Sequence, residues 1–159
     1  MARYSVAILG ASGLVSQRLQ ELLYDHPFFE VVAIASSPKN VGLLYEEIEW
    51  RLESPRPYYD ILLCSMSDIP DVDIAFSALP NNVAEIVEPS LVARGIHVFS
   101  NASVFRRVAG IPLVIPEINP EAMVSYEGHA CATNCTVVPV AMPIKGLMPL
   151  GIKSVSIHT

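Results

Sequence analysis

The sequence predicts an α/β fold in which helices cover both faces of a doubly wound parallel sheet. Short apolar runs recur along the chain and alternate with amphipathic segments, which is the order of a parallel sheet with helical crossovers. The first apolar run, Tyr4–Leu9, leads directly into the glycine turn Gly10–Gly13 and then into a segment with helical spacing. A strand, a glycine turn and a helix in this order are typical of Rossmann-like nucleotide-binding domains.

The predicted strands are short runs rich in valine, isoleucine, leucine and phenylalanine. They cover residues 4–9, 29–35, 60–64, 73–77, 96–100 and 153–158, and a short apolar segment lies at 113–115. Apolar residues at helical spacing predict helices over 14–24, 82–93 and 136–147. We expect Pro89 to be tolerated in the second helix and Pro143 to kink or end the third. The polar segment 36–59 is expected to be irregular, with at most one short helix.

Composition and charge narrow the class of protein. The chain has 159 residues, 52% of them hydrophobic and 16% charged, against about 25% charged in average soluble proteins. Either the sheet is buried on both faces or part of the surface meets another domain or subunit. The net charge of −6 without a basic run argues against nucleic acid as a partner, and no apolar stretch is long enough for a membrane span. An odd number of cysteines and a start without a signal peptide predict a reduced, cytoplasmic protein.

The glycine turn is a candidate dinucleotide site. Gly10 would permit a tight turn, and Gly13 would let the backbone approach a pyrophosphate at the helix N-terminus. Ser16 stands where the fingerprint usually has its third glycine. The end of the second strand carries Ser36, Ser37 and Lys39 in place of the acidic residue that NAD enzymes use, which favours NADP. The alternatives are an ordinary glycine turn and a polar loop with a solvated lysine.

Cys135 is the candidate nucleophile. It comes just before the apolar run 137–150, and a cysteine at the start of a helix is favoured as thiolate. A cysteine beside a nucleotide cradle suggests oxidation or reduction of an acyl group through a thioester, with Asn134 and nearby N–H groups stabilising the oxyanion. Arg106 and Arg107 follow a strand end, where an arginine can grip a phosphate, although a solvated pair is the alternative. None of the four histidines is marked by its spacing as a general base.

Taken together, these segments resemble the aspartate-semialdehyde dehydrogenases, in their archaeal and fungal-like branch. The resemblance rests on motifs that run nearly end to end: Gly10–Val15, Ala35–Ser37, Trp50–Leu52, Asp71–Pro80, Phe99–Ser103, Pro112–Pro120 and Thr133–Thr136. It implies NADPH-dependent reductive dephosphorylation of aspartyl-4-phosphate to aspartate 4-semialdehyde, a step towards lysine, threonine and methionine.

The resemblance also assigns roles to residues. It makes Cys135 the nucleophile, with Asn134 beside the oxyanion, and it gives Arg106 and Asn101 the substrate phosphate. The residues expected to bind the cofactor are Gly10, Ser12, Gly13, Leu14, Val15, Ser36, Ser37, Lys39, Ser77 and Ala78.

Members of the family are roughly twice as long as this chain. We therefore expect an NADP-binding domain over 1–150 that ends in the cysteine helix, and the first strand of a second domain over 151–159. That second domain would carry the catalytic histidine, the arginine for the substrate carboxylate and the main subunit contacts of a homodimer or tetramer. This chain alone is expected to have negligible turnover.

The sequence is also compatible with three other functions. A malonyl-CoA reductase would use the same thioester chemistry on a CoA ester, although the segment around Cys135 fits the dehydrogenases better. An N-acetylglutamyl-phosphate reductase is disfavoured because its Gly-Cys-Tyr context is missing. A non-catalytic NADP-binding module, in which Cys135 is a packed thiol, is the alternative of a different class.

Overall fold

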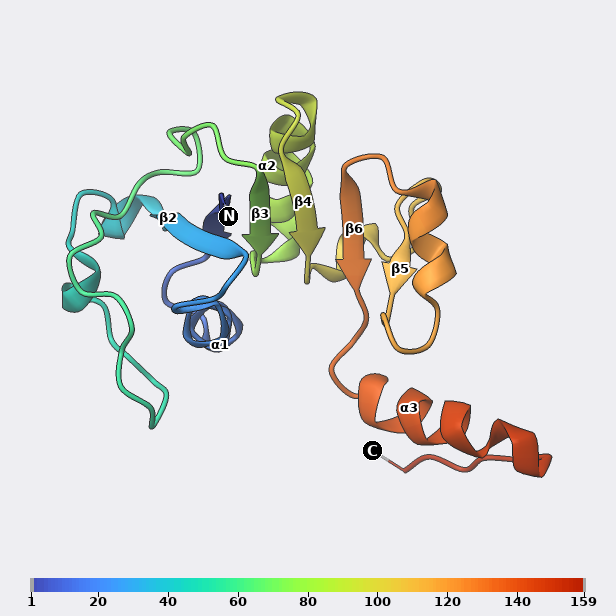
Figure 1. Cartoon of the computed structure of the whole chain (residues 1–159). Coiled ribbons are helices and arrows are strands. Elements are labelled where there is room, and N and C mark those ends of the chain that lie inside the picture. Colours follow the sequence, from blue (N-terminus) through green and yellow to red (C-terminus); the bar gives the residue numbers. More distant parts are fainter. Residues whose placement is uncertain (1, 159) are drawn as a thin grey trace.

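A six-stranded parallel sheet forms the centre of the computed structural model, which describes residues 2–158. The strands are β1 (Tyr4–Leu9), β2 (Phe29–Ala35), β3 (Ile74–Ser77), β4 (His97–Ser100), β5 (Leu113–Val114) and β6 (His129–Ala132). Their order is β2-β1-β3-β4-β6-β5, and all neighbours are parallel. Figure 1 shows β3, β4, β6 and β5 ending at one edge. The predicted α/β class is confirmed.

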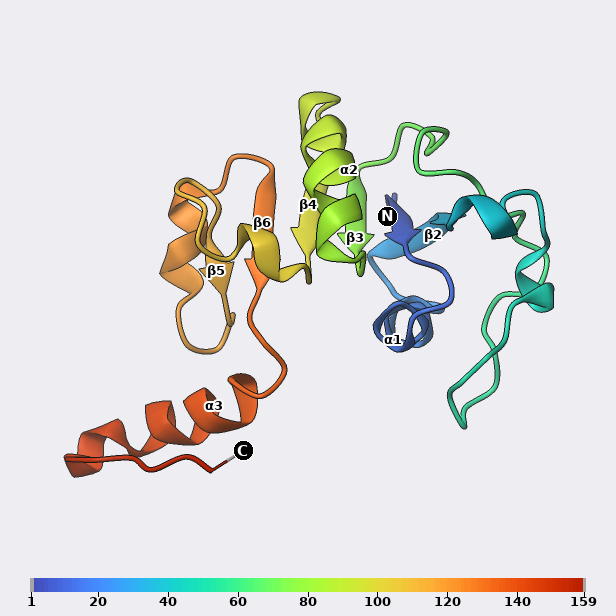
Figure 2. The same ribbon diagram turned by 180° about the vertical axis from the view of Figure 1, so that it is seen from behind.

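Two helices cover opposite faces of this sheet. Side chains alternate along each strand, so both faces carry apolar residues that a helix can bury. Ala7 and Leu9 of β1 belong to the apolar cluster that includes Leu91 of α2 (Asn81–Ala93). Ile8 faces the other way, into the cluster that includes Leu23 of α1 (Leu14–Leu23). In Figure 2 α2 lies in front of β3 and β4, whereas in Figure 1 it lies behind them. The doubly wound arrangement is therefore present at the β2-β1-β3-β4 half of the sheet.

The prediction of a strand over residues 60–64 is wrong. Cys64 makes a single bridge to Ala35, and Leu62 makes another to Leu44, so no ladder develops along the edge of β2. The neighbour of β1 on the other side is β3, from the next predicted strand. As expected, the connection before β3 is irregular, and it holds two short 3-10 turns, Pro38–Asn40 and Tyr45–Glu47, where at most one short helix was expected.

Strand β6 was missed by the sequence analysis. Its four residues lie between β4 and β5, with Val98 opposite His129 and Leu113 opposite Cys131. The strand is short and holds two alanines and a histidine, so neither an apolar run nor alternation marks it in the sequence. Two further 3-10 segments, Ser103–Phe105 and Pro120–Ser125, flank β5 in the chain.

The C-terminal part of the chain differs from expectation in three ways. Helix α3 begins at Val138, after a turn at 135–137, and it runs through Pro143 to Leu147, so this proline does not end it. The predicted strand over 153–158 does not form, because residues 151–158 have no strand to pair with. They run back alongside α3 (Figures 1 and 2). The expected division at residue 150 stays a prediction, and its end residues Met1 and Thr159 lie outside the described residues.

Within residues 2–158, each helix is too short or too polar to cross a lipid bilayer.

Candidate functional site

The glycine turn after β1 is shaped by close backbone contact. Gly10 has a φ of +104°, and its N–H donates to the carbonyl of Ala35 at 2.9 Å. A Cβ atom on Gly10 would lie 3.1 Å from the carbonyl oxygen of Ala78, which is tighter than an ordinary contact. Gly13 forms the N-cap of α1, and its N–H donates to the carbonyl of Gly10 at 3.1 Å. Glycine is therefore required at position 10 by both conformation and space.

A pocket of about 340 Å³ opens beside this turn, at the carboxyl ends of β1, β2 and β3. Six of the ten predicted cofactor residues line it: Gly10, Ser12, Gly13, Ser36, Ser37 and Ala78. The other lining residues, which the sequence analysis did not single out, are Pro38, Met66, Leu79, Pro80 and Val83. Parallel strands that end together explain why segments from three parts of the chain meet here.

The other four predicted cofactor residues lie outside the lining of this pocket. Leu14 is the first residue of α1 and is exposed, while Val15 lines a separate apolar pocket. Lys39 is exposed in the 3-10 turn that follows Ser37. Ser77 is buried, and its hydroxyl donates to the Glu88 carboxylate at 2.6 Å.

Two parts of the pocket suit the phosphate groups of a dinucleotide: the N-terminus of α1 and the end of β2. The first N–H groups of α1 lack a side-chain cap, and its first turn has no acidic residue, so the positive end of the helix is available to an anion. At the end of β2, Ser36 and Ser37 bring hydroxyl groups and no carboxylate. The Ser36 hydroxyl already accepts a hydrogen bond from the side-chain amide of Asn40 at 3.2 Å. These residues fit a nucleotide cofactor.

The loop after β6 carries the exposed Cys135. The Oδ1 atom of Asn134 accepts hydrogen bonds from the Thr136 N–H at 2.9 Å and the Thr136 hydroxyl at 2.8 Å, and the Cys135 sulfur lies 3.6 Å from it. These contacts orient the Asn134 side chain, and its amide nitrogen is the group that can donate to an oxyanion. Cys135 lies a turn ahead of α3, since the Val137 N–H donates to the Asn134 carbonyl at 3.0 Å.

Arg106 connects this loop to the loop that follows β4. Its Nη2 donates to the carbonyl of Asn101 at 2.9 Å, and its Nε donates to the carbonyl of Ala132 at 3.1 Å. The structure thus brings Asn101 and Arg106 together beside the end of β6, two residues before Asn134. Arg107 is exposed.

The other two cysteines differ from Cys135 in their surroundings. Cys131 is buried, and burial together with the nearby Glu88 charge raises its pKa to about 11. Burial also raises the pKa of Cys64, which is half-buried. His129 is buried as well, with Nε2 at 2.9 Å from the Glu88 carboxylate. Glu88 was not predicted as a site residue, although its spacing from Ala84 and Leu91 places it on the buried face of α2.

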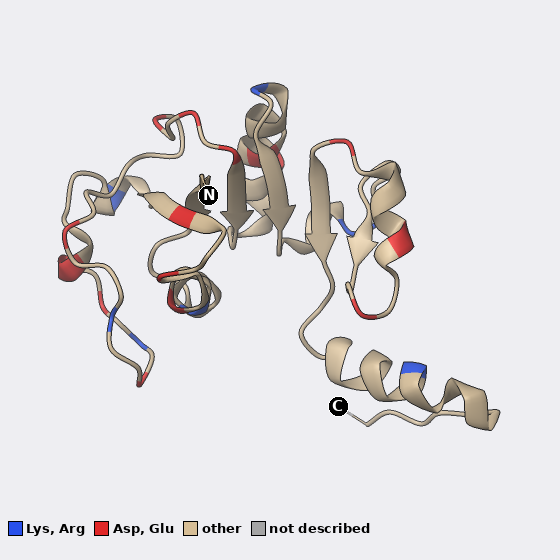
Figure 3. Ribbon diagram, in the orientation of Figure 1, with Lys and Arg blue, Asp and Glu red and all other residues tan. Residues whose placement is uncertain are grey.

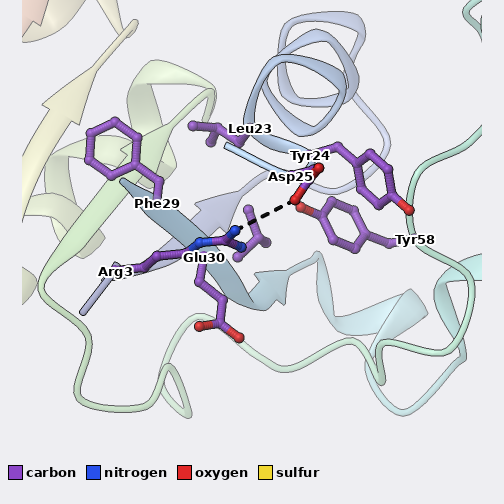
Figure 4. Close-up of a pocket in the computed structure, with 8 residues that line it drawn as sticks. Arg3, Leu23, Tyr24, Asp25, Phe29, Glu30 and Tyr58 are labelled. Atoms are coloured by element: carbon purple, nitrogen blue, oxygen red, sulfur yellow. Dashed lines mark ion pairs between the residues drawn. The ribbon is translucent and has the colours of Figure 1, made fainter. Parts of the chain in front are cut away.

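A second hollow lies at the opposite edge of the sheet, where β1 and β2 begin. It measures about 310 Å³ and includes Arg3, Tyr24, Glu30 and Tyr58 in its lining (Figure 4). Arg3 pairs with the exposed Asp25 at 3.5 Å. None of the predicted site residues lies here. Charged residues gather mainly on the outer loops and turns (Figure 3), and α3 carries Lys145 as its charged residue.

The chain matches known proteins in both its sequence and its fold. Residues 5–126 match the family model of the semialdehyde dehydrogenase NAD binding domain. The chain is similar to an aspartate-semialdehyde dehydrogenase of Archaeoglobus fulgidus, at 38% identity over 98% of the chain and 49% of the relative. A second relative with that name, from Methanothermobacter thermautotrophicus, is 43% identical over 74% of the chain and 35% of its own length.

A solved structure shows the same fold. The crystal structure of aspartate-semialdehyde dehydrogenase with NADP from Candida albicans has a TM-score of 0.84 and 31% identity, covering 94% of this chain and 48% of that one. The chain spans about half the length of the first of these relatives and of this solved protein.

Proposed function

The chain belongs to the semialdehyde dehydrogenase family, whose NAD-binding domain it contains, and we propose that it is the NADP-binding half of an aspartate-semialdehyde dehydrogenase. The observation that carries this proposal is the pocket where the glycine turn, the serines after β2 and Ala78 meet. It lies at the edge of the sheet from which the loop with Cys135 also emerges.

NADP is favoured over NAD by the end of β2. The hydroxyls of Ser36 and Ser37 line the pocket, and the exposed Lys39 lies two residues further on. A carboxylate, which would repel a 2′-phosphate, is missing from 35–40. The similar Candida protein was crystallised with NADP.

The cofactor assignment is tested by titration with NADPH and NADH. Trp50 is the single tryptophan, so quenching of its emission by energy transfer to the reduced nicotinamide reports binding. We expect NADPH to bind at least ~10-fold more tightly than NADH, equivalent to about 1.4 kcal/mol, and Lys39→Ala to reduce that ratio. Equal affinities for the two cofactors would refute the choice of NADP.

The proposed chemistry is acyl transfer to Cys135. Its sulfur attacks the acyl carbon of aspartyl-4-phosphate, the phosphate leaves, and a thioester remains on the enzyme. The free amide nitrogen of Asn134 stabilises the oxyanion. The Nε and Nη2 atoms of Arg106 donate hydrogen bonds to backbone carbonyls, which fixes the guanidinium group. Its Nη1 atom then binds the substrate phosphate, together with Asn101. When bound, the nicotinamide supplies the hydride that reduces the thioester to the aldehyde.

Acyl-enzyme formation can be followed directly by mass spectrometry. We expect aspartyl-4-phosphate to add an aspartyl group to the peptide that contains Cys135, and Cys135→Ser to lack this adduct. An adduct formed from malonyl-CoA instead would indicate a malonyl-CoA reductase. If neither donor labels Cys135 while NADPH still binds, these 159 residues lack acyl-transfer activity by themselves, which favours a non-catalytic NADP-binding module.

The proposed partner is the half of the relatives that this chain does not span. Helix α3 has no buried residue, and exposed apolar side chains continue along it and the following segment: Val137, Val138, Met142, Leu147, Met148, Leu150, Ile152, Val155 and Ile157. An apolar pocket of about 430 Å³ also lies open over Phe76 and Phe99. Large exposed apolar surfaces mark interaction sites. We expect the 159-residue chain by itself to show negligible NADPH-dependent turnover. Turnover at the rates of full-length family members would refute this expectation.

A further inference from the structure

Glu88 lies at the centre of a buried hydrogen-bond network between α2 and the sheet. Its side chain is 0% exposed. Its Oε1 atom accepts hydrogen bonds from the hydroxyls of Ser77 at 2.6 Å and Ser100 at 2.9 Å, and its Oε2 lies 2.9 Å from Nε2 of His129. One carboxylate therefore contacts three adjacent strands, β3, β4 and β6.

These three strands lead into the three loops of the candidate site. Ser77 is the last residue of β3, and the next residue, Ala78, lines the cofactor pocket. Ser100 is the last residue of β4; its hydroxyl also accepts a hydrogen bond from the Ala102 N–H at 3.0 Å, which fixes the turn that contains Asn101. His129 belongs to β6, which ends just before the loop with Asn134 and Cys135.

A buried carboxylate is energetically unfavourable compared with an apolar side chain. Burying an ionised group costs several kcal/mol unless hydrogen bonds and charge partners compensate, and an apolar side chain of similar size is often neutral or stabilising. Around Glu88 the other facing groups are the Cys131 thiol, whose pKa the Glu88 charge helps to raise, and Phe105, whose ring meets that of His129 edge-on at 4.7 Å. Apolar packing could fill this space without the desolvation penalty, so the presence of the polar network points to a role in geometry.

We propose that Glu88 is a positioning residue that holds the loop after β3, which begins at Ala78, the Asn101–Arg106 loop and the Cys135 loop in a fixed relation. The roles of those loops rest on the proposed function, whereas the network itself does not. Among residues 2–158, the Glu88 carboxylate is the side-chain group that hydrogen-bonds to all three strands, so its removal releases three loops at once.

Hydrogen–deuterium exchange tests this on the chain without cofactor. The reporter amides, one for each strand end, are those of Ala78, Asn101 and Cys131, which donate to Leu9 O, Ser77 O and Pro112 O. In Glu88→Ala we expect at least ~10-fold faster exchange at all three, while Gly10 and Ala11, bonded to Ala35 O, keep their rates. Glu88→Gln retains the shape and an accepting oxygen, so it should restore much of the lost protection.

Two further variants sharpen the test. Glu85→Ala, on an exposed position of the same helix, is the matched control and should change no reporter amide. His129→Asn removes only the link to β6, so Cys131 should exchange faster while Asn101 is unchanged. Equal acceleration at every amide in Glu88→Ala, or no acceleration at the reporters, would overturn the proposal. Should Glu88→Ala fail to fold, His129→Asn decides, and its own failure to fold counts against the assignment.

A second measurement separates positioning from stability. In the wild-type chain, NADPH should slow alkylation of Cys135 by iodoacetamide, and in Glu88→Ala this protection should fall at least ~3-fold at saturating NADPH. Full protection in Glu88→Ala would contradict a positioning role. If NADPH fails to protect Cys135 even in the wild type, the proposed function fails instead, and the exchange data still decide the role of Glu88.

Discussion

Substitution of the two glycines of the cofactor turn separates folding from binding. In Gly10→Ala, the φ of +104° strains an L-residue by about 1–3 kcal/mol, and the Cβ contact of 3.1 Å with Ala78 O adds about 1 kcal/mol. Alanine also lowers the conformational entropy of the unfolded chain, which offsets about 0.4–1 kcal/mol of this loss. The expected net loss of unfolding free energy is about 1–3.5 kcal/mol.

Gly13→Ala should behave differently. Gly13 has extended backbone angles (φ −78°, ψ 145°) that alanine adopts freely, and its added Cβ would meet only Gly10 O, at an ordinary 3.6 Å. We expect the unfolding free energy to stay within about 1 kcal/mol of wild type. Gly13 lines the pocket proposed to receive the pyrophosphate, so the added methyl group should lower NADPH affinity at least ~10-fold.

Urea unfolding followed by Trp50 emission gives the stability, and NADPH titration gives the affinity. Gly42→Ala is the matched control, because Gly42 has a φ of +84° with no atom within 4 Å of the added Cβ and lies outside the pocket lining. It should lose less stability than Gly10→Ala and bind NADPH normally. Wild-type affinity in Gly13→Ala would refute the placement of the pyrophosphate. Equal losses of stability in Gly10→Ala and Gly42→Ala would refute the close contact with Ala78.

The remaining predictions concern titratable side chains. Because burial raises the pKa of Cys131 from 9.0 to about 11, the native state keeps a proton that the unfolded state loses; unfolding free energy should fall by up to about 3 kcal/mol between pH 9 and 11, and less in Cys131→Ala. Iodoacetamide at pH 8 should label the exposed Cys135 before Cys64 or Cys131, and mass spectrometry showing the reverse order would contradict the structure. The hydrogen bonds from Ser5 lower the pKa of Asp73 below 3.8, so its contribution is present above that pH and lost on acidification. The stability difference between wild type and Asp73→Asn should therefore shrink from pH 5 to pH 3 in urea titrations.

Local sequence was sufficient for the N-terminal half of the fold. Strand β1, helix α1 and strand β2 were predicted with boundaries within a residue, because each has a strong apolar period and β1 runs directly into the glycine turn. The glycine turn was predicted for the same reason, since its chemistry depends on neighbours in the chain. The resemblance of the motifs to aspartate-semialdehyde dehydrogenases also came from sequence, and the family is confirmed.

The errors arose where pairing across the sheet decides structure. The run 60–64 is apolar, yet it meets β2 at a single bridge, whereas β6 is not marked by its composition and becomes a strand because it fits between β4 and β5. The segment 153–158 has a strand-like composition but no partner within residues 2–158. A strand is stabilised by hydrogen bonds to a neighbour, and that neighbour is not encoded in the segment itself.

The sequence by itself determined the family, the glycine turn and the candidate thiol, because these depend on residue type and local spacing. Tertiary structure decided which residues share a site. It brought Ser36, Ser37 and Ala78 into the pocket of Gly10. It also buried Ser77 against Glu88, a residue that no local pattern connects to the strands it joins. Contacts between residues distant in sequence follow from how strands order themselves in the sheet, and that order is a property of the whole packed chain.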